Sequence, residues 1–312
     1  MTAPGPSPSP SPAPIDGWLA VFPSMAPLRE QLVRGASSEA PLLVVGEPGV
    51  GRSTLARALH AASRRAAGPL VELDVGSVPV DLFESELFGH RAGSFTGAAR
   101  DRRGRVAEAE GGTLVLDRVE ELPIEIQPKL LRLLAERVYA PLGGREIAAD
   151  VRFVSVASED LDRRVARGDF REDLYYRLEV IAFEVPPLRR RAGDLAVAAP
   201  AILEDLRRRY GRGELRLAEE DLDWMRGYSW PGNLRQLRNL LERAVVLQQQ
   251  GELRVARPGE GSRERPGTLH EVEARAIRDA LSYTRGHQGR AAELLGISRK
   301  GLWEKRKRHR IP

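Results

Sequence analysis

Hydrophobic positions in the first half of the chain form four short apolar runs separated by amphipathic stretches. The runs are residues 41–46, 70–75, 111–117 and 150–158. Short apolar runs bounded by turn residues are typical of buried strands. Because helical stretches lie between them, the pattern predicts an α/β fold with a parallel sheet that is covered on both faces.

The pattern changes in the second half of the chain, where the strand signals stop. Residues 193–249 have helical periodicity, which is interrupted at 211–213 and at 229–233. A polar stretch, residues 251–267, has the composition of a linker. Three helical segments joined by short turns follow it, so the sequence predicts a second, small all-α domain at the C-terminus.

The N-terminal end of the chain is rich in proline. Residues 3–14 read APGPSPSPSPAP, and proline fixes φ and lacks an N–H donor, so we expect a mobile, extended leader there. The predicted organisation is a disordered leader (1–19), an α/β domain (20–190), a helical subdomain (191–250), a linker (251–268) and the all-α domain (269–312).

Composition excludes several classes of protein. The absence of cysteine rules out disulfides and cysteine metal sites. No apolar run approaches the ~20 residues that span a bilayer, and the N-terminus lacks the charged and apolar regions of a signal peptide. We therefore expect a cytoplasmic protein that does not act at a membrane.

Charge is unevenly distributed. The whole chain carries +5, yet Ser298 to Pro312 alone hold seven basic residues against one acidic residue, Glu304. A basic end on a near-neutral body suggests a polyanionic partner for that end. A solvated tail is the alternative, and charge by itself does not decide between them.

GEPGVGRST, residues 46–54, has the spacing of a phosphate-binding loop, G-x-x-x-x-G-K-[ST], with arginine in place of lysine. Glycines at these positions let backbone N–H groups converge on phosphates at the start of the next helix. A glycine-rich strand–helix turn is the alternative. The candidate nucleotide-contacting residues are Gly46, Glu47, Pro48, Gly49, Val50, Gly51, Arg52, Ser53 and Thr54.

An acidic residue, Asp117, ends the third predicted strand downstream of this loop. Such a residue commonly holds Mg²⁺ beside a bound triphosphate, and the Ser53 hydroxyl is a candidate second ligand. A single Asp after a strand is otherwise a frequent turn former. Its pairing with the loop favours ATP and Mg²⁺ as ligands.

Four further motifs occur in a fixed order. They are DLFESELFGHRAGSFTGA (81–98), GGTLVLDRVEELP (111–123), FREDLYYRLEV (170–180) and YSWPGNLRQLRN (228–239). Together they closely resemble the AAA+ domain of bacterial enhancer-binding proteins, the activators that remodel sigma-54 RNA polymerase, over about residues 20–250. Residues 269–312 resemble a Fis-type helix-turn-helix. The resemblance implies an AAA+ P-loop domain with a parallel sheet and a helical lid, followed by a small helix-turn-helix domain.

The resemblance also implies roles for particular residues. Arg171 and Arg177 match arginine fingers that act in trans on a neighbouring subunit, and Arg235 matches the sensor arginine of the lid. Without the family, these would be surface arginines and a helix-starting turn. The stretch that matches the sigma-54 contact loop, with serine replacing an alanine, is Gly93, Ser94, Phe95, Thr96, Gly97 and Ala98.

Four positions depart from the family pattern around the expected γ-phosphate. Besides Arg52, they are Arg118 for a glutamate, and Asp74 and Ser158 for asparagines. A lost general base costs about 10²–10⁴-fold in rate, so we expect ATP binding to persist and hydrolysis to be weak or lost. Glu120 could stand in for the missing glutamate, but it lies two residues past Arg118 and is expected to point elsewhere.

Two of these changes introduce opposite charges on adjacent strands. We hypothesise that Asp74 and Arg118 form an ion pair that replaces a switch pair of the family. Removing one partner of a partly buried pair costs roughly 3–5 kcal/mol, so single changes should destabilise more than the double change. Neutral drift at an unused site is the alternative.

The C-terminal segment AAELLGIS predicts a helix, a glycine turn and a second helix capped by Ser298. Leu302 is expected to pack inward, whereas Trp303 fits either orientation. Arg299 and Lys300 are candidates for base contacts in double-stranded DNA, and a dimeric, palindromic site is expected. The DNA-binding candidates are Ser298, Arg299, Lys300, Trp303, Lys305, Arg306, Lys307 and Arg308.

Two functions follow from these motifs. The first is a sigma-54-dependent transcriptional regulator that binds ATP and enhancer DNA, contacts sigma-54 RNA polymerase and forms a homo-oligomer, a hexamer by resemblance. The second is a non-hydrolysing DNA-binding regulator that uses the AAA+ fold as a nucleotide-gated scaffold. Measurement of ATP turnover discriminates between them.

Overall fold

The computed structural model describes residues 15–248, 251–257, 277, 280, 281, 284, 287–295 and 297–309. The chain divides into two compact units, Met1–Val255 and Ala256–Pro312. In the part that the structure describes, no helix is long and apolar enough to cross a membrane.

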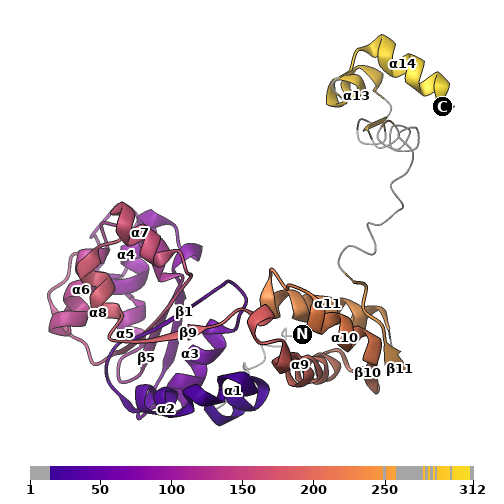
Figure 1. Ribbon diagram of the computed structural model, residues 1–312. Helices are drawn as coiled ribbons and strands as arrows, with labels where there is room; N and C mark the ends of the chain where they lie inside the picture. Colours follow the sequence, from indigo (N-terminus) through magenta and orange to yellow (C-terminus); the bar gives the residue numbers. More distant parts are fainter. Residues whose placement is uncertain are drawn as a thin grey trace, which may run out of the picture. The chain divides into compact units, whose positions relative to one another are not determined.

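A five-stranded parallel sheet forms the centre of the first unit (Figure 1). Its strand order is β2-β5-β8-β1-β9. Its strands are β1 (Leu42–Gly46), β2 (Leu70–Asp74), β5 (Thr113–Asp117), β8 (Arg152–Ala157) and β9 (Ile181–Val185). The four predicted strands are confirmed. The edge strand β9 was not predicted, because its exposed Ala182 and Glu184 interrupt the apolar run.

Register places the carboxyl ends of the strands side by side. Asp74, the last residue of β2, lies opposite Asp117, the last residue of β5, which in turn lies opposite Val156 of β8. Ligands of open α/β sheets bind outside the carboxyl ends of the strands. This edge is therefore where the phosphate loop and the acidic residues meet.

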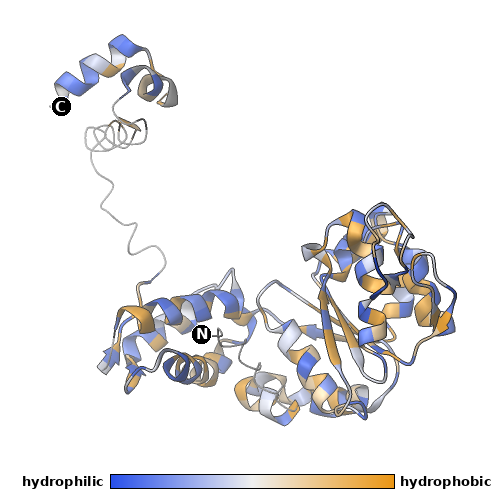
Figure 2. Ribbon diagram, turned by 180° about the vertical axis from the view of Figure 1, so that it is seen from behind, coloured by the Kyte–Doolittle hydropathy of each residue, from blue (hydrophilic) through white to orange (hydrophobic). Residues whose placement is uncertain are grey.

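Helices cover both faces of the sheet (Figures 1 and 2). One buried cluster includes Leu42, Val44, Leu55 and Leu59, and another on the opposite face includes Phe83, Leu114 and Phe153. The covering helices are α1 (Ile15–Val21), α2 (Arg29–Ser37), α3 (Arg52–Ala61), α4 (Val80–Phe88), α5 (Arg105–Glu108), α6 (Gln127–Glu136), α7 (Leu161–Arg167) and α8 (Glu172–Leu178). Short paired strands add β3 (Gly89–His90) with β4 (Arg102–Arg103), and β6 (Val138–Tyr139) with β7 (Ile147–Ala148).

The predicted end of the leader at residue 19 is wrong. Residues 15–21 form α1, in which Ile15, Trp18 and Leu19 are buried. These three apolar side chains drive the helix onto the domain, since each gains about 1.5–3 kcal/mol by leaving water. The proline-rich residues 1–14 lie outside the described residues.

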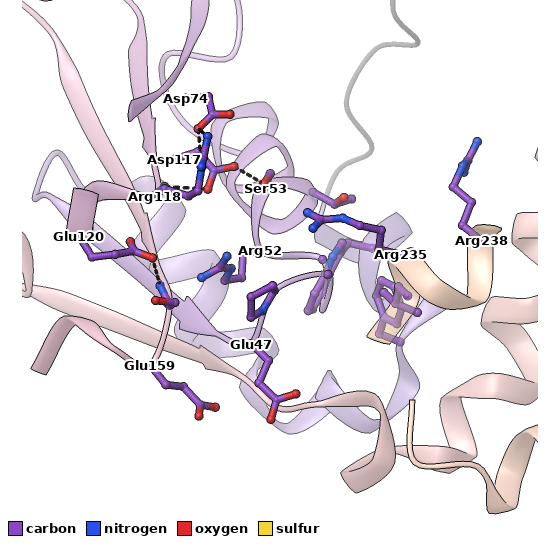
Figure 3. A pocket seen from close by; sticks show the side chains of 18 of the residues that line it. Glu47, Arg52, Ser53, Asp74, Asp117, Arg118, Glu120, Glu159, Arg235 and Arg238 are labelled. Atoms are coloured by element: carbon purple, nitrogen blue, oxygen red, sulfur yellow. Dashed lines mark hydrogen bonds and ion pairs between the residues drawn. The ribbon is translucent and has the colours of Figure 1, made fainter. Parts of the chain in front are cut away.

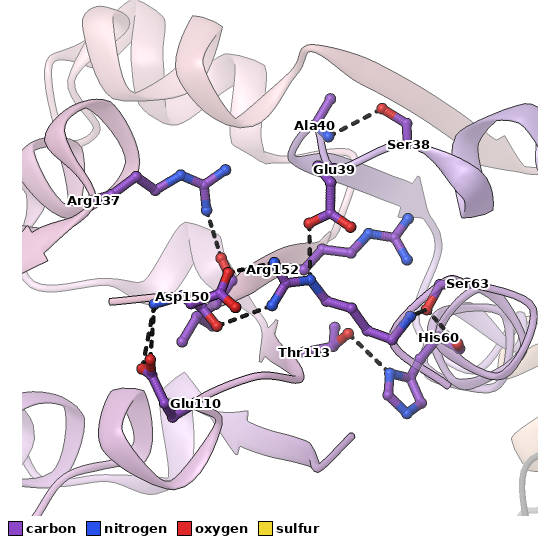
Figure 4. A network of polar contacts seen from close by, with 12 residues as sticks. Ser38, Glu39, Ala40, His60, Ser63, Glu110, Thr113, Arg137, Asp150 and Arg152 are labelled. Atoms are coloured by element: carbon purple, nitrogen blue, oxygen red, sulfur yellow. Dashed lines mark hydrogen bonds and ion pairs between the residues drawn. The ribbon is translucent and has the colours of Figure 1, made fainter. Parts of the chain in front are cut away.

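The amino ends of the strands carry a polar network on the edge opposite the phosphate loop (Figure 4). Arg152 is fully buried and donates to the Gly35 carbonyl at 2.8 Å. His60 and Thr113 form a hydrogen bond of 2.8 Å, and Arg65 bridges Glu39 and Asp150. Burial and the nearby Arg152 charge lower the pKa of His60. This network ties α2 and α3 to the sheet.

The helical subdomain contains α9 (Leu195–Tyr210), α10 (Glu219–Gly227) and α11 (Asn233–Leu247). Trp230, Leu237 and Leu241 are fully buried between these helices. A small parallel pair, β10 (Leu215–Leu217) with β11 (Gly251–Leu253), closes one end. The predicted linker start at 251 is therefore wrong, because Leu253 and Val255 bury their side chains in this subdomain.

The second unit contains α13 (Gln288–Leu294) and α14 (Arg299–Arg308). Ala291, Ala292 and Leu302 are buried in its core, with Ile277 and Ala280 packed beside them. Most of the first predicted helical segment of this unit, and Gly296 of the turn, lie outside the described residues.

Candidate functional site

A cleft with a volume of about 940 Å³ opens at the carboxyl edge of the sheet, between the phosphate loop and the helical subdomain (Figure 3). It brings together most of the predicted site, namely Glu47, Pro48, Gly49, Gly51, Arg52, Ser53, Thr54, Asp74, Asp117, Arg118, Ser158 and Arg235. Sequence reasoning missed Trp18 and Arg238, which also line it. The aromatic Trp18 was assigned to the leader, where its burial could not be seen.

Glycine is required in the loop itself. Gly49 and Gly51 have φ of +82° and +104°, in the left-handed region that favours glycine. A Cβ at Gly49 would lie 2.6 Å from the carbonyl oxygen of Gly232 in the helical subdomain. The loop leads directly into α3, whose N-terminal amides favour a negative ligand.

Ser53 and Asp117 meet in the cleft, where the Ser53 hydroxyl donates to Asp117 Oδ2 at 2.8 Å. Both groups offer oxygen ligands, which Mg²⁺ prefers. Among the described residues no cluster of three or more His, Cys, Asp or Glu side chains is suited to a metal. These two residues therefore fit a Mg²⁺ ion that takes its remaining ligands from phosphates and water, as is usual in nucleotide sites.

Arg52 is buried in the cleft, with 8% of its surface exposed. Burial lowers the pKa of its guanidinium, while the charges of Asp117 and Glu120 favour the protonated form. Its Nη1 has no hydrogen-bond partner in the described part of the chain. A buried donor without a partner is costly, so this guanidinium is arranged to accept an anionic ligand such as phosphate.

Glu120 corrects an expectation from the sequence. Arg118 has φ of +58°, in the left-handed region, and residues Val119–Glu121 form a 3-10 turn, η3. This reversal ends the alternation of the strand and turns Glu120 back into the cleft. Glu120 is 6% exposed, and its Oε1 accepts a hydrogen bond of 3.0 Å from the Ser158 backbone N–H.

Arg118 points instead toward β2 and forms the hypothesised ion pair. Its Nε donates to Asp74 Oδ1 at 2.7 Å, and its Nη1 lies 3.3 Å from Glu121 Oε1. The hydrogen bond to Asp74 raises the pKa of Arg118. The two paired side chains are 37% and 49% exposed, so this pair is weaker than the partly buried pair predicted from the sequence.

We expect a double-mutant cycle of Asp74→Ala and Arg118→Ala to give a coupling of about 0.2–1 kcal/mol in the free energy of unfolding, as for other exposed pairs. Equilibrium urea denaturation measures it. Arg57 and Glu72 form a comparable pair, 46% and 36% exposed, which serves as the control. Strict additivity of the two changes would show that Asp74 and Arg118 are not coupled in solution.

Glu47 joins the phosphate loop to the helical subdomain. Its carboxylate accepts hydrogen bonds from Arg189 Nη1 at 2.8 Å and from Asn233 Nδ2 at 3.0 Å. The Asn233 carbonyl oxygen accepts from the Leu188 N–H at 2.8 Å. Sequence reasoning missed these partners, although Asn233 belongs to the WPGN motif. Arg189 and Asn233 lower the pKa of Glu47 from 4.5 to about 2.

This shift predicts a pH dependence. A carboxylate whose pKa is lowered by folding stabilises the fold at pH values above its pKa in the unfolded state. This contribution is lost as the pH falls toward its pKa in the folded state. For Glu47 this loss of stability is expected between pH 4.5 and about pH 2. Thermal melts should show that the melting temperature falls less steeply over this pH range for Glu47→Gln than for the parent. Equal slopes would contradict the assignment, and the exposed Glu159→Gln variant is the control.

The two candidate arginine fingers lie away from the cleft of their own chain. Arg171 pairs with Asp173 at 2.7 Å, and Arg177 Nη2 donates to the Leu134 carbonyl at 3.2 Å. Neither lines the cleft, nor do Gly46 and Val50 of the loop. A role in trans therefore stays a prediction.

The stretch from Gly93 to Ala98 forms a loop closed on itself. The Gly93 N–H donates to the Ala98 carbonyl at 2.8 Å, and the Ala98 N–H to the Phe95 carbonyl at 3.0 Å. Phe95 is 39% exposed and lies edge-on to His90, with ring centroids 4.9 Å apart. The loop thus presents an aromatic side chain beside Thr96 at the surface.

The expected features of the C-terminal helix are present in α14. The Ser298 hydroxyl caps it by accepting from the Gly301 N–H at 3.0 Å, and Leu302 is buried. Arg299 and Lys300 are exposed at its start, and Trp303 is 57% exposed with Lys307 over its ring. Trp303 is thus turned outward. The side chain of Arg308 lies outside the described part.

Three family models match the chain. They are the Sigma-54 interaction domain (residues 20–184), the AAA+ ATPase lid domain (189–265) and the bacterial regulatory protein, Fis family (268–309). Among solved structures, NtrX from Brucella abortus is similar, with a TM-score of 0.72 and 28% identity over 95% of this chain and 72% of that chain. A structure of NtrX in complex with ATP has a TM-score of 0.70 and 30% identity, over 92% and 67% of the two chains.

Curated relatives are similar over nearly the whole chain. The alginate biosynthesis transcriptional regulatory protein AlgB of Pseudomonas aeruginosa is 39% identical, over 94% of this chain and 68% of that protein. The regulatory protein AtoC of Escherichia coli is 38% identical, over 91% and 65%. The chain spans about two thirds of the length of these relatives. With the Sigma-54 interaction domain, the lid and the Fis-type helix-turn-helix all present, this chain belongs to the family of sigma-54-dependent transcriptional regulators.

Proposed function

We propose that this chain binds ATP in the cleft, binds enhancer DNA through α14, and contacts sigma-54 through residues 93–98. The observation that carries the proposal is the cleft itself, in which the phosphate loop, Asp117 and Arg235 line one space. Similarity to NtrX, which has been crystallised with ATP and with ADP, supports a nucleotide as the ligand.

Each part of the cleft has a definable task in this proposal. The loop amides and Arg52 bind phosphate oxygens, and Ser53 and Asp117 hold Mg²⁺, which would neutralise charge on the phosphates. Arg235 approaches from the helical subdomain, so a bound nucleotide would link that subdomain to the loop. Binding energy would in this way be coupled to the position of α11.

We propose that hydrolysis is slow or absent, because position 118 carries an arginine that is drawn toward Asp74. A non-hydrolysing regulator that uses nucleotide only to gate assembly is the second candidate, and the same Asp74–Arg118 pair favours it. The ATPase requires the assembly of several copies, with Arg171 and Arg177 acting on a neighbour.

Steady-state ATP turnover at high protein concentration tests the choice, with binding of a fluorescent ATP analogue measured alongside. Turnover that Arg177→Ala abolishes supports the ATPase. Nucleotide and duplex DNA binding without turnover support the gated scaffold. Absence of nucleotide binding would contradict both.

The sigma-54 contact is tested separately. Phe95→Ala should abolish binding to sigma-54 in the presence of nucleotide, because an exposed aromatic side chain is a typical interaction hot spot. DNA and nucleotide binding should be unchanged, since Phe95 lies outside the cleft. Retained sigma-54 binding would contradict the assignment.

A further inference from the structure

Two side chains of opposite charge reach toward the same space in the cleft (Figure 3). Glu120 enters from the turn after β5 and Arg52 from the start of α3, and both line the cleft. Both are more than nine-tenths buried, at 6% and 8% exposure. Burial of a charged group is unfavourable unless a partner satisfies it.

Each of the two side chains has a buried polar atom whose partner is missing. In the described part of the chain, Glu120 Oε2 has no hydrogen-bond partner, and neither has Arg52 Nη1. One atom is an acceptor and the other a donor. A ligand between them that offers an acceptor to Arg52 and a proton to Glu120 satisfies both, and a phosphate group with an attacking water has that chemistry.

The backbone fixes the position of Glu120. Its second oxygen, Oε1, accepts from the Ser158 N–H at 3.0 Å, which ties the carboxylate to the end of β8. Arg118, with φ of +58°, directs the chain back toward the cleft, and a non-glycine residue in this region costs about 1–3 kcal/mol. Such backbone strain is found at functional sites, where it holds a side chain in place.

We infer that Glu120 is a catalytic residue that activates water for hydrolysis of the bound nucleoside triphosphate. The water oxygen forms a bond to the γ-phosphorus while the bond from that phosphorus to the β–γ bridging oxygen breaks. The electron pair stays on the departing diphosphate, and the water proton passes to Glu120 Oε2 and then to solvent. This inference rests on the proposed nucleotide site, and it predicts that the chain hydrolyses ATP slowly, with Glu120 as the base.

Glu120→Gln is the decisive variant, because its amide oxygen still accepts from the Ser158 N–H while its basicity is lost. We expect turnover to fall about 10²–10⁴-fold, the usual loss for a general base. We also expect ATP to bind several-fold more tightly with ADP affinity unchanged, because a negative charge beside the γ-phosphate is removed. Binding of fluorescent ATP and ADP analogues measures this second effect without relying on activity.

Glu125→Gln is the matched control, since it removes an exposed carboxylate that does not line the cleft. It should leave turnover and both affinities unchanged. Thermal melts should show that Glu120→Gln folds like the parent, and Glu120→Asp, which keeps a carboxylate, should retain part of the turnover.

Two results would overturn the inference while leaving the nucleotide site intact. One is ATP binding by the parent without any turnover. The other is turnover that Glu120→Gln leaves within twofold of the parent. Failure of the parent to bind ATP would instead refute the nucleotide site itself, and the inference with it.

Discussion

Replacement of Arg191 by methionine is expected to reduce the free energy of unfolding by about 3–5 kcal/mol, the usual cost of removing one partner of a buried ion pair. Arg191 is 3% exposed, and burial lowers the pKa of its guanidinium to about 10 while the charge of Asp194 opposes this. Its Nη1 lies 3.8 Å from Asp194 Oδ2. The variant leaves the Asp194 carboxylate buried without its countercharge.

The same change should also weaken nucleotide binding, because Arg191 connects three parts of the site. Its Nη2 donates to the Val50 carbonyl in the phosphate loop at 2.6 Å. Its guanidinium lies 4.8 Å from the centre of the Phe22 ring, beside α1. Asp194, which directly precedes α9, accepts from the Ser24 N–H at 2.8 Å. Loss of Arg191 therefore loosens the loop, α1 and the helical subdomain together.

Urea denaturation followed by far-UV circular dichroism measures the stability, and a fluorescent ATP analogue measures the affinity. The double variant Arg191→Met, Asp194→Asn is the control, and it should lose less stability than Arg191→Met because no charge is left unpaired. A single variant as stable as the parent would show that the buried pair does not hold these parts together.

The second large effect concerns Trp230, which is fully buried in the helical subdomain. Trp230→Ala should cost about 3–5 kcal/mol, because deletion of a buried aromatic side chain leaves a cavity. The indole N–H also donates to the Met225 carbonyl at 2.8 Å, and the ring packs edge-on against Trp224 and Tyr228. The loss should appear first as melting of the helical subdomain.

Trp230→Phe separates packing from hydrogen bonding. It keeps a ring but removes the indole donor, while the Tyr228 N–H still donates to the Met225 carbonyl at 3.4 Å. We therefore expect a loss of about 0.5–1.5 kcal/mol, the net value of one hydrogen bond. Differential scanning calorimetry should resolve an early transition in Trp230→Ala. A melting profile equal to that of the parent would contradict the central position of Trp230 in this subdomain.

The fold and most of the cleft could be predicted from sequence because their signals are local. The strands that carry Gly46 and Asp117 are continuous apolar runs, and the glycines of the loop satisfy a backbone requirement that leaves a direct trace in the sequence. The Ser298 cap and the buried Leu302 follow from helical spacing in the same way. The Asp74–Arg118 pair was also predicted, since Asp74 ends β2 and Arg118 directly follows the neighbouring strand β5.

Other features could not be predicted, because they depend on contacts between distant segments. From sequence, Trp18 belongs to a proline-rich leader, whereas in the structure it is buried and lines the cleft. Leu253 belongs to a predicted linker, whereas in the structure it lies in β11, which pairs with β10. The exposure of the Asp74–Arg118 pair, which sets its strength, likewise depends on what surrounds it. Glu47 gains its role from partners more than 140 residues away, and Arg191 connects its neighbour Asp194 to the carbonyl of Val50, 141 residues away.

By itself, the sequence determined a parallel α/β domain with a phosphate loop, a helical subdomain and a basic helix-turn-helix, since periodicity and spacing encode each of them. The tertiary structure alone decided the direction of Glu120. Strand alternation predicts that it points away, but a left-handed residue at Arg118 reverses the chain and buries the carboxylate opposite Arg52. Residue types do not predict this backbone angle, because a non-glycine residue adopts a positive φ only where its surroundings compensate the strain.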